Sequence, residues 1–496
     1  MARTFSFAAP RPRGLLGRRF EPDEQLVLGA GFGGGLLMLW LVPGIPFKIC
    51  AFVGWLGVCV TAVLLPYQGR TYLRWWEINR TYRRSLRDGS LLYTSSAPQA
   101  GVHLSGQPVA IALPPGIPAD LRWIDAPTAY GQIAVLLQPG EQMFCAAVEV
   151  EAQRDFGSLD IEDKESLIGA WEHLLRSTAD SGGRIRRLQW IARMVPADPN
   201  AHARDAHTRA DPQATDWLHA SYTELQQAVA LFAEDRRLVL VVGIPYTPDL
   251  VAEARRYNSL AEGFAVCLGK EIEAFIRSLG QGQLRHVRNL DEPALASYFQ
   301  HAYGPDHWLD DTVGMNRATA WPAELDARPE DHVIARSFEG AKPWYSATAW
   351  VKKWPVLQVS VNFMAPLILY VKDIVFTVAV TMDLVPGDQA LTEAMADSTN
   401  EIGQADHKAG KLKDPRETAA QRKSLSTVQE IADGAAGIRL AGWVTVTSSS
   451  KEALDQDKDT VRAAAARAQI RLDWCDKEHH RALANTLPLC TGLLRS

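Results

Sequence analysis

Two residues near the C-terminal end of the sequence, Ser448 and Lys451, have the spacing of a catalytic serine–lysine pair. Such a pair would let the lysine accept the serine proton during nucleophilic attack. The two residues, however, join an expected strand to an expected helix, where a serine commonly caps the first helical turn. We therefore interpret the pair as a helix cap.

A second candidate chemistry is zinc binding at Cys475 and His479, which are four residues apart on an expected helix. This spacing places two soft ligands on one helix face, with His480 and Cys490 nearby. Nothing else in the sequence completes a four-ligand pattern, so a solvated helix end is the preferred interpretation. The same interpretation applies to two polar clusters, His202, Asp205, His207 and Asp211, and His301, His307, Asp310 and Asp311.

Nucleotide and ester hydrolysis have no recognisable motif in the sequence. The nearest approach to a phosphate-binding loop is Gly403 with Gly410-Lys411, but its spacing is wrong, and Leu412 stands where a serine or threonine would bind magnesium. No Gly-x-Ser-x-Gly elbow occurs. We expect no enzyme activity, no catalytic or metal-binding residues and no cofactor.

Two apolar segments precede all of these residues, Leu26–Val42 and Ile49–Leu65. Each would form about 25 Å of helix, close to the roughly 30 Å of a bilayer core. The connecting residues 43–48 contain two prolines and a glycine, which favour a reversal of the chain. The pattern predicts a transmembrane helical hairpin. A cleaved signal peptide and a hairpin buried in a soluble domain are the alternatives.

Charge sets the expected orientation of this hairpin. The 496 residues carry 52 basic and 57 acidic side chains, but residues 1–89 hold 12 basic and only 5 acidic ones. Arginines flank both ends of the hairpin, whereas Lys48 alone lies in the turn. The positive-inside rule then predicts a plasma-membrane protein with both termini in the cytoplasm. The acidic remainder argues against direct nucleic-acid binding, and six scattered cysteines indicate reduced thiols.

The candidate interaction sites are glycines in the first apolar segment, and arginines and tryptophans after the second. Glycines allow close helix packing, within the hairpin or against another subunit: Gly29, Gly31, Gly33 and Gly35. Arginine and tryptophan favour the lipid headgroup region, and the following residues form a candidate membrane-interface helix: Arg70, Arg74, Trp75, Trp76, Arg80, Arg83 and Arg84. Packing of this helix on the following domain is the alternative.

The remaining sequence predicts a large cytosolic α+β region, with mixed or antiparallel sheets and packed helices, because strand-like and helix-like segments do not alternate regularly. One helix is expected over residues 249–279, and a projecting helical arm over 388–434. The expected divisions are a basic arm, the hairpin, a juxtamembrane helix and two α+β domains: 1–25, 26–65, 66–93, 94–320 and 321–496.

The order of these features resembles an actinobacterial family of integral membrane proteins from conjugation and type IV secretion-like gene clusters. In that family a PrgI-type two-span subunit is joined to a region similar to the N-terminal domain of the secretion ATPase, without its motor. The resemblance is carried by residues 70–76 after the hairpin, by Trp354-Pro355 with the segment beginning at Pro366, and by Ala463–Arg471 with residues 483–488. Residues 470–477 depart from the family pattern.

The resemblance implies a non-enzymatic inner-membrane structural subunit of a type IV secretion-like or conjugative apparatus. Its expected partners are the lipid bilayer, a separate secretion ATPase docked at the cytosolic face, and other copies or channel subunits. The alternatives are a membrane-tethered enzyme with an unrecognised site and a signalling protein.

Overall fold

The structure, a computed structural model, describes most of the chain. The described residues are 22–41, 44–64, 66–67, 70–97, 112–154, 156–179, 183–196, 215–230, 234–338, 342–355, 359–385 and 437–493. The helices are α1 (Pro22–Leu41), α2 (Ile45–Leu64), α3 (Tyr72–Arg87), α5 (Ile161–Ala179), α7 (Asp216–Ala230), α8 (Pro248–Ala254), α9 (Leu260–Ser278), α10 (Glu292–Tyr303), α11 (Ala365–Ile368), α14 (Lys451–Arg467) and α15 (His479–Ala484).

One large sheet forms the centre of the fold, and a two-stranded ribbon of β1 (Pro66–Tyr67) and β2 (Arg70–Thr71) lies beside α3. The strands of the large sheet are β3 (Leu92–Thr94), β4 (Arg122–Thr128), β5 (Gly131–Gln138), β6 (Met143–Ala152), β7 (Arg187–Pro196), β8 (Glu234–Pro245), β9 (Leu284–Asn289), β10 (Glu324–Asp326), β11 (Val333–Arg336), β12 (Trp344–Lys353), β13 (Val375–Val385), β14 (Gly437–Ser448) and β15 (Arg471–Trp474).

The sheet has the strand order β3-β10-β11-β12-β14-β13-β7-β8-β6-β5-β4, with β15 beside β12 and β9 beside β6. Every pairing among the described strands is antiparallel. The predicted α+β class with an antiparallel sheet is therefore confirmed. The boundary expected at residue 320 falls inside this sheet, since β3 pairs with β10, and β7 with β13.

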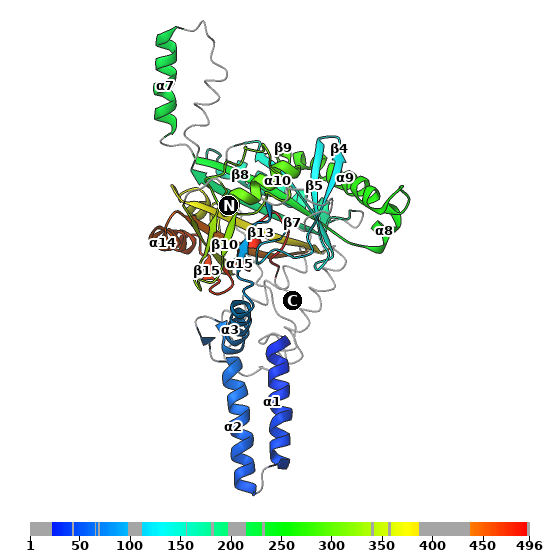
Figure 1. Cartoon of the computed structure of the whole chain (residues 1–496), viewed down its shortest axis with the longest axis vertical. Coiled ribbons are helices and arrows are strands. Elements are labelled where there is room, and N and C mark those ends of the chain that lie inside the picture. Colours follow the sequence, from blue (N-terminus) through cyan, green and yellow to red (C-terminus); the bar gives the residue numbers. More distant parts are fainter. Residues whose placement is uncertain are drawn as a thin grey trace.

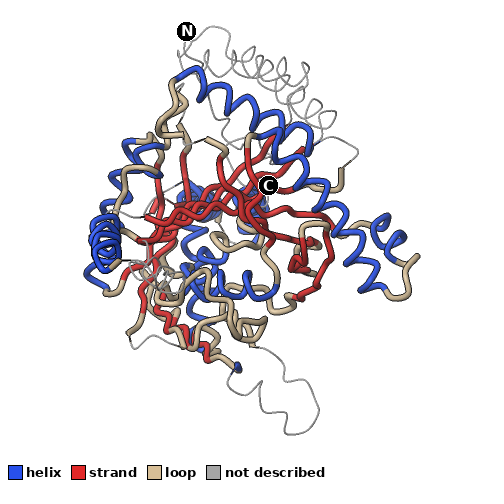
Figure 2. Tube along the Cα trace, turned by 90° about the horizontal axis from the view of Figure 1, so that it is seen from above, coloured by secondary structure: helices blue, strands red, loops and turns tan. Residues whose placement is uncertain are grey.

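Alternating apolar residues explain how both faces of the sheet are covered. Successive side chains of a strand point to opposite faces, and in β6 Cys145 and Ala147 enter one core while Phe144, Ala146 and Val148 enter the other. The first core packs under α10 and the residues after α15. On the opposite face, α5, α8 and α9 cover one part of the sheet and α14 another. Figure 2 shows strands crossing the middle of the molecule between helices.

The helix predicted over 249–279 is two helices, α8 and α9, because the chain turns at residues 255–259. Ser259 caps α9, accepting a hydrogen bond from the Glu262 amide. At Gly263 a β-carbon would lie only 2.0 Å from the Ala254 carbonyl oxygen, so the two helices meet at a backbone contact that only glycine allows.

The apolar N-terminal segments form a helical hairpin, α1 and α2, that projects from the sheet (Figure 1). Among the helices that the structure describes, none is both long and apolar enough to cross a membrane. The prediction of two transmembrane helices in the plasma membrane, with both termini cytoplasmic, is therefore wrong. Both helices have 20 residues, but their sequences are not apolar throughout. α1 begins with Pro22-Asp23-Glu24 and has a glycine-rich centre, and α2 carries Lys48 in its first turn.

Several predictions concern segments outside the described residues. These are the basic arm up to residue 21, the polar cluster at 202–211, the helical arm at 388–434 and the glycine–lysine sequence at 403–411.

Candidate docking surfaces

The α1–α2 hairpin is held together by a close approach at two of the four predicted packing glycines. A β-carbon on Gly31 would lie 2.8 Å from the Cys59 side chain, and one on Gly35 would lie 2.9 Å from the Phe52 ring. At the neighbouring Gly34, a β-carbon would lie 2.9 Å from the indole nitrogen of Trp55. Gly29 and Gly33 have no described atom within 4 Å of that position and lie on the outer surface.

The outer surface of the hairpin is apolar on many sides. Trp40 is 90% exposed, and large apolar side chains continue along both helices: Phe32, Leu36, Leu37, Ile45, Phe47, Ile49, Val53, Trp55 and Val58. Apolar residues scattered singly on a surface need no explanation, whereas a contiguous set marks a place where another molecule binds. The hairpin is therefore the first candidate docking surface.

A second apolar surface lies on α7, which projects from the end of the sheet opposite to the hairpin (Figure 1). Leu218, Tyr222 and Leu225 follow one another at helical spacing, and all are exposed, as is Trp217. The described part of this face points to solvent. An apolar stripe at positions i, i+4 and i+7 is how a helix binds a groove on a partner.

The predicted membrane-interface helix, α3, packs on the sheet domain through one face. Ile78 and Tyr82 are buried, and the Tyr82 hydroxyl donates a hydrogen bond to the Arg328 carbonyl. Lys477, which lies near the other end of the sequence, contacts the same face of α3. Its ammonium group lies 4.1 Å from the centre of the Trp75 ring and donates to Asn79. Packing on the domain, the alternative drawn from the sequence, is thus present.

The other face of α3 exposes five of the predicted residues to solvent: Arg74, Trp76, Arg80, Arg83 and Arg84. Arg74 pairs with Glu77 at 3.2 Å, and the Arg80 guanidinium lies 5.2 Å from the centre of the Trp76 ring. Arg83 and Arg84 are exposed, and Arg70 lies in the short strand β2. The result is a basic face between the apolar hairpin and the acidic sheet domain. An acidic partner segment fits it by charge.

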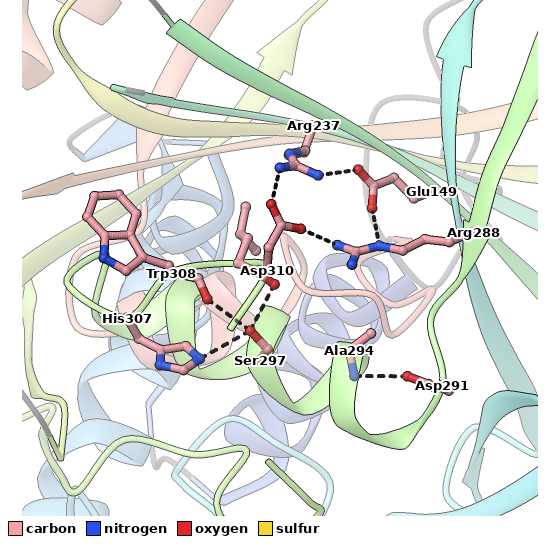
Figure 3. A network of polar contacts seen from close by, with 10 residues as sticks. Glu149, Arg237, Arg288, Asp291, Ala294, Ser297, His307, Trp308 and Asp310 are labelled. Atoms are coloured by element: carbon pink, nitrogen blue, oxygen red, sulfur yellow. Dashed lines mark hydrogen bonds and ion pairs between the residues drawn. The ribbon is translucent and has the colours of Figure 1, made fainter. Parts of the chain in front are cut away.

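His301 in α10 and His307 on the loop after it do not form an open catalytic site. The fully buried Ser297 hydroxyl lies 3.1 Å from His307 Nε2, as in a serine–histidine pair, but it also reaches the carbonyls of Trp308 and Leu309 (Figure 3). Burial, with Arg193 nearby, holds the pKa of His301 well below its usual value, so this ring is neutral. These contacts fasten the loop after α10 to the helix.

Two arginines and two carboxylates form a closed ring at the edge of the same region (Figure 3). The buried Glu149 accepts from Arg237 at 2.8 Å and from Arg288 at 2.6 Å. Asp310, on the loop after α10, accepts from the same two arginines at 2.6 and 2.9 Å. The ring neutralises its own charge and joins β6, β8 and β9 to the loop. Of these residues, the sequence had suggested only Asp310, and for a different role.

Arg193 is a buried residue that no local sequence pattern indicated. It is fully enclosed, and donates to the Thr377 hydroxyl at 2.7 Å and to the His301 carbonyl at 2.9 Å. Burial lowers its pKa to about 10. It joins β7, β13 and α10, three elements far apart in the sequence, so no local spacing could have revealed it.

Ser448 and Lys451 each have other partners. Ser448 donates to Asp457 at 2.6 Å, and the Lys451 ammonium binds Asp455 and Asp331. Although burial opposes it, hydrogen bonding from Lys451 holds the pKa of the Asp331 carboxyl below its usual value. The predicted helix cap exists, but it is Ser450 rather than Ser448 that caps α14.

The candidate zinc ligands are likewise engaged elsewhere. His479 Nδ1 accepts the backbone N–H of Thr348 at 3.0 Å, and burial lowers the pKa of His479. The buried Cys475 thiol lies 3.9 Å from the Asp473 carbonyl. Within the described ranges, no group of three or more histidine, cysteine or acidic side chains is placed to hold a metal ion.

One hollow of about 470 Å³ lies on the surface beside α8, lined by Tyr246, Pro248, Val251 and Arg255 among others. Comparison of the chain with known protein families and with characterised proteins finds no match.

Proposed function

We propose that this chain is a non-enzymatic scaffold subunit of a type IV secretion-like or conjugative apparatus. The observation that carries the proposal is the apolar α1–α2 hairpin, which projects from the sheet domain and is joined to it through the anchored helix α3. In this role the hairpin packs against the equivalent helices of other copies or of channel subunits. The assignment to a secretion apparatus depends on the family resemblance of the sequence.

The α7 end of the domain is the proposed docking point for a separate ATPase. Its apolar face lies at the opposite end of the sheet from the hairpin, so both partners can bind at once (Figure 1). The basic face of α3 would add contacts to acidic segments of neighbouring subunits. Two apolar surfaces and one basic surface on the same chain would let the subunit bind several partners together.

The test of the hairpin is association between copies, measured by cross-linking and sedimentation on the full chain. Substituting Trp40 and Phe47 with serine should weaken self-association by tenfold or more, because apolar burial contributes about 25 cal/mol per Å². Val313, also 90% exposed but on the loop after α10, provides the matched control Val313→Ser. The proposed role of the hairpin would be overturned if the hairpin variant and the control self-associate equally. It would also be overturned if the chain binds lipid vesicles and does not bind other protein copies.

The test of α7 is co-purification with an ATPase encoded by a neighbouring gene. The double variant Leu218→Ser/Leu225→Ser should lose the ATPase while keeping hairpin-dependent association. Retention of the ATPase by this variant would exclude α7 as the docking point. Failure of the wild-type chain to bind any such ATPase would count against the secretion assignment itself.

A further inference from the structure

A C-terminal strap, residues 485–492, crosses one face of the large sheet after α15. It is built of a short apolar sequence, and Leu487, Leu489 and Cys490 in it are buried within the core under α10. The described strap belongs to no strand or helix. Its backbone groups must therefore find their partners elsewhere.

Side chains from five neighbouring strands supply these partners. Gln138 on β5 donates to the Leu489 carbonyl at 2.6 Å, and Gln189 on β7 accepts the Cys490 amide at 2.9 Å. Further along, Thr381 on β13 donates to the Thr491 carbonyl at 2.8 Å and Trp443 on β14 to the Gly492 carbonyl at 3.1 Å. The thiol of Cys145 on β6 lies 3.2 Å from the Leu489 carbonyl.

Two cysteines meet where the strap crosses the middle of the sheet. The Cys490 thiol lies 3.4 Å from the carbonyl of Val241 on β8. In the β6–β8 pairing Val241 stands opposite Ala147, and Ala147 is on the same face of β6 as Cys145. Cys145 also contacts Leu489, the residue before Cys490, and the Cys145 thiol adds to burial in raising the pKa of Cys490. Cys490 has φ of 52°, an uncommon left-handed conformation for a residue with a side chain.

We propose that Cys145 and Cys490 form a dithiol site that a peroxide converts into a disulfide, fixing the C-terminal strap to the central strand β6. One thiolate sulfur attacks hydrogen peroxide, the O–O bond breaks, and a sulfenic acid and hydroxide form. The sulfur of the second cysteine then attacks the sulfenic sulfur, the S–O bond breaks, and the S–S bond forms. The protons of the two thiols leave in two molecules of water.

The surroundings of the two thiols set the rate of this reaction. Both side chains are buried, and a raised pKa keeps the Cys490 thiol protonated. Buried, protonated thiols react slowly, so the reaction requires brief detachment of the strap. Oxidation should therefore be slow at neutral pH and become faster as pH rises or when mild denaturant loosens the strap. The site is independent of the proposed scaffold function.

The experiment exposes the full chain to hydrogen peroxide, blocks remaining thiols with an alkylating reagent, and searches the unreduced digest for a Cys145–Cys490 peptide by mass spectrometry. The linked peptide should form in the wild type and in Cys267→Ser, whose thiol is buried on the opposite face of the sheet. It should be absent from Cys145→Ser and Cys490→Ser. Hydrogen exchange of residues 489–492 should slow by about tenfold or more in the linked protein, because the link suppresses local opening.

Two outcomes overturn the proposal. In the first, the folded wild type is oxidised at either residue to the sulfinic state, or both thiols remain alkylatable, and no linked peptide forms. In the second, the link forms but exchange of the strap is unchanged, so that the bond does not restrain it. Both readouts use the wild-type chain, and they remain decisive even if a serine variant fails to fold.

Discussion

Lys477 should control whether α3 stays attached to the sheet domain. Its side chain is only 11% exposed, lies over Trp75, donates to Asn79, and stands 3.4 Å from the more exposed Glu330. A partly desolvated cation–π contact contributes about 1 kcal/mol, and a charged donor to a neutral acceptor about 1.5 kcal/mol. The exposed pair with Glu330 adds little. Lys477→Met keeps the apolar stem and removes these contacts, at a cost of about 2 kcal/mol to the attachment of α3.

Trypsin cleavage within α3 measures this attachment. Once α3 opens, trypsin can cleave after any of four arginines: Arg80, Arg83, Arg84 and Arg87. Their side chains are exposed in the closed helix, but a helical backbone resists cleavage. A loss of about 2 kcal/mol should raise the rate of cleavage roughly 30-fold, since 1.36 kcal/mol corresponds to a factor of ten. Lys353→Met, an exposed position at the end of β12, is the control and should match the wild type. Equal cleavage of Lys477→Met and wild type would refute the anchoring role.

Three further substitutions test the packing and the charges described above. Gly263→Ala should lower the free energy of unfolding, measured by urea denaturation, by about 2 kcal/mol or more, because the added β-carbon would clash with the Ala254 carbonyl. The control is Gly169→Ala in α5, where no described atom lies within 4 Å of the added β-carbon. This variant should be neutral or slightly stabilising. Glu149→Gln should lower the free energy of unfolding by about 2 kcal/mol, because two arginines lose their charged partner. The control is Glu151→Gln, in an exposed pair with Arg285, which should change the free energy of unfolding by no more than about 0.5 kcal/mol. Burial, with Arg481 nearby, lowers the pKa of His480 from 6.5 to about 4, so the unfolded state binds a proton first. The free energy of unfolding is therefore unaffected by this histidine above pH 6.5 and decreases by up to about 3 kcal/mol as pH falls towards 4. His480→Gln should reduce this loss of stability, which can be measured from urea midpoints at pH 7.5 and pH 4.5.

Local patterns in the sequence were sufficient for the class of fold. The irregular order of strand-like and helix-like segments predicted the α+β class, and the sequence predicted one helix over residues 249–279, where α8 and α9 lie. The chain turn between α8 and α9 was missed because it depends on a backbone contact at Gly263 that forms only when the two helices pack. The pairing of β7 with β13, and of β3 with β10, likewise joins segments that are far apart in the sequence. No short window of the sequence contains the register of such pairs.

The candidate sites divide in the same way. The arginine-rich face of α3 is local, so its residues could be found from spacing, but Lys477, which decides where that helix lies, is hundreds of residues away. The prediction that the hairpin spans a membrane depended on the length of two apolar runs, the turn between them and the flanking arginines. The contribution of glycine and of the charged first turns was underestimated. The polar atoms of Ser448 and His479 already have partners in distant elements or turns, Asp457 and Thr348, which the spacing of the residues did not reveal.

The position of β14 in the sheet has a consequence for how the chain is made. β14 lies between β12 and β13, and both of those strands are synthesised before it. Until the ribosome delivers residues 437–448, β12 and β13 have no partner between them, and each presents a row of unpaired backbone groups to other nascent chains. Folding of the sheet centre is therefore delayed until late in translation. A chaperone that shields strand edges should raise the yield of this protein more than one that accelerates helix formation.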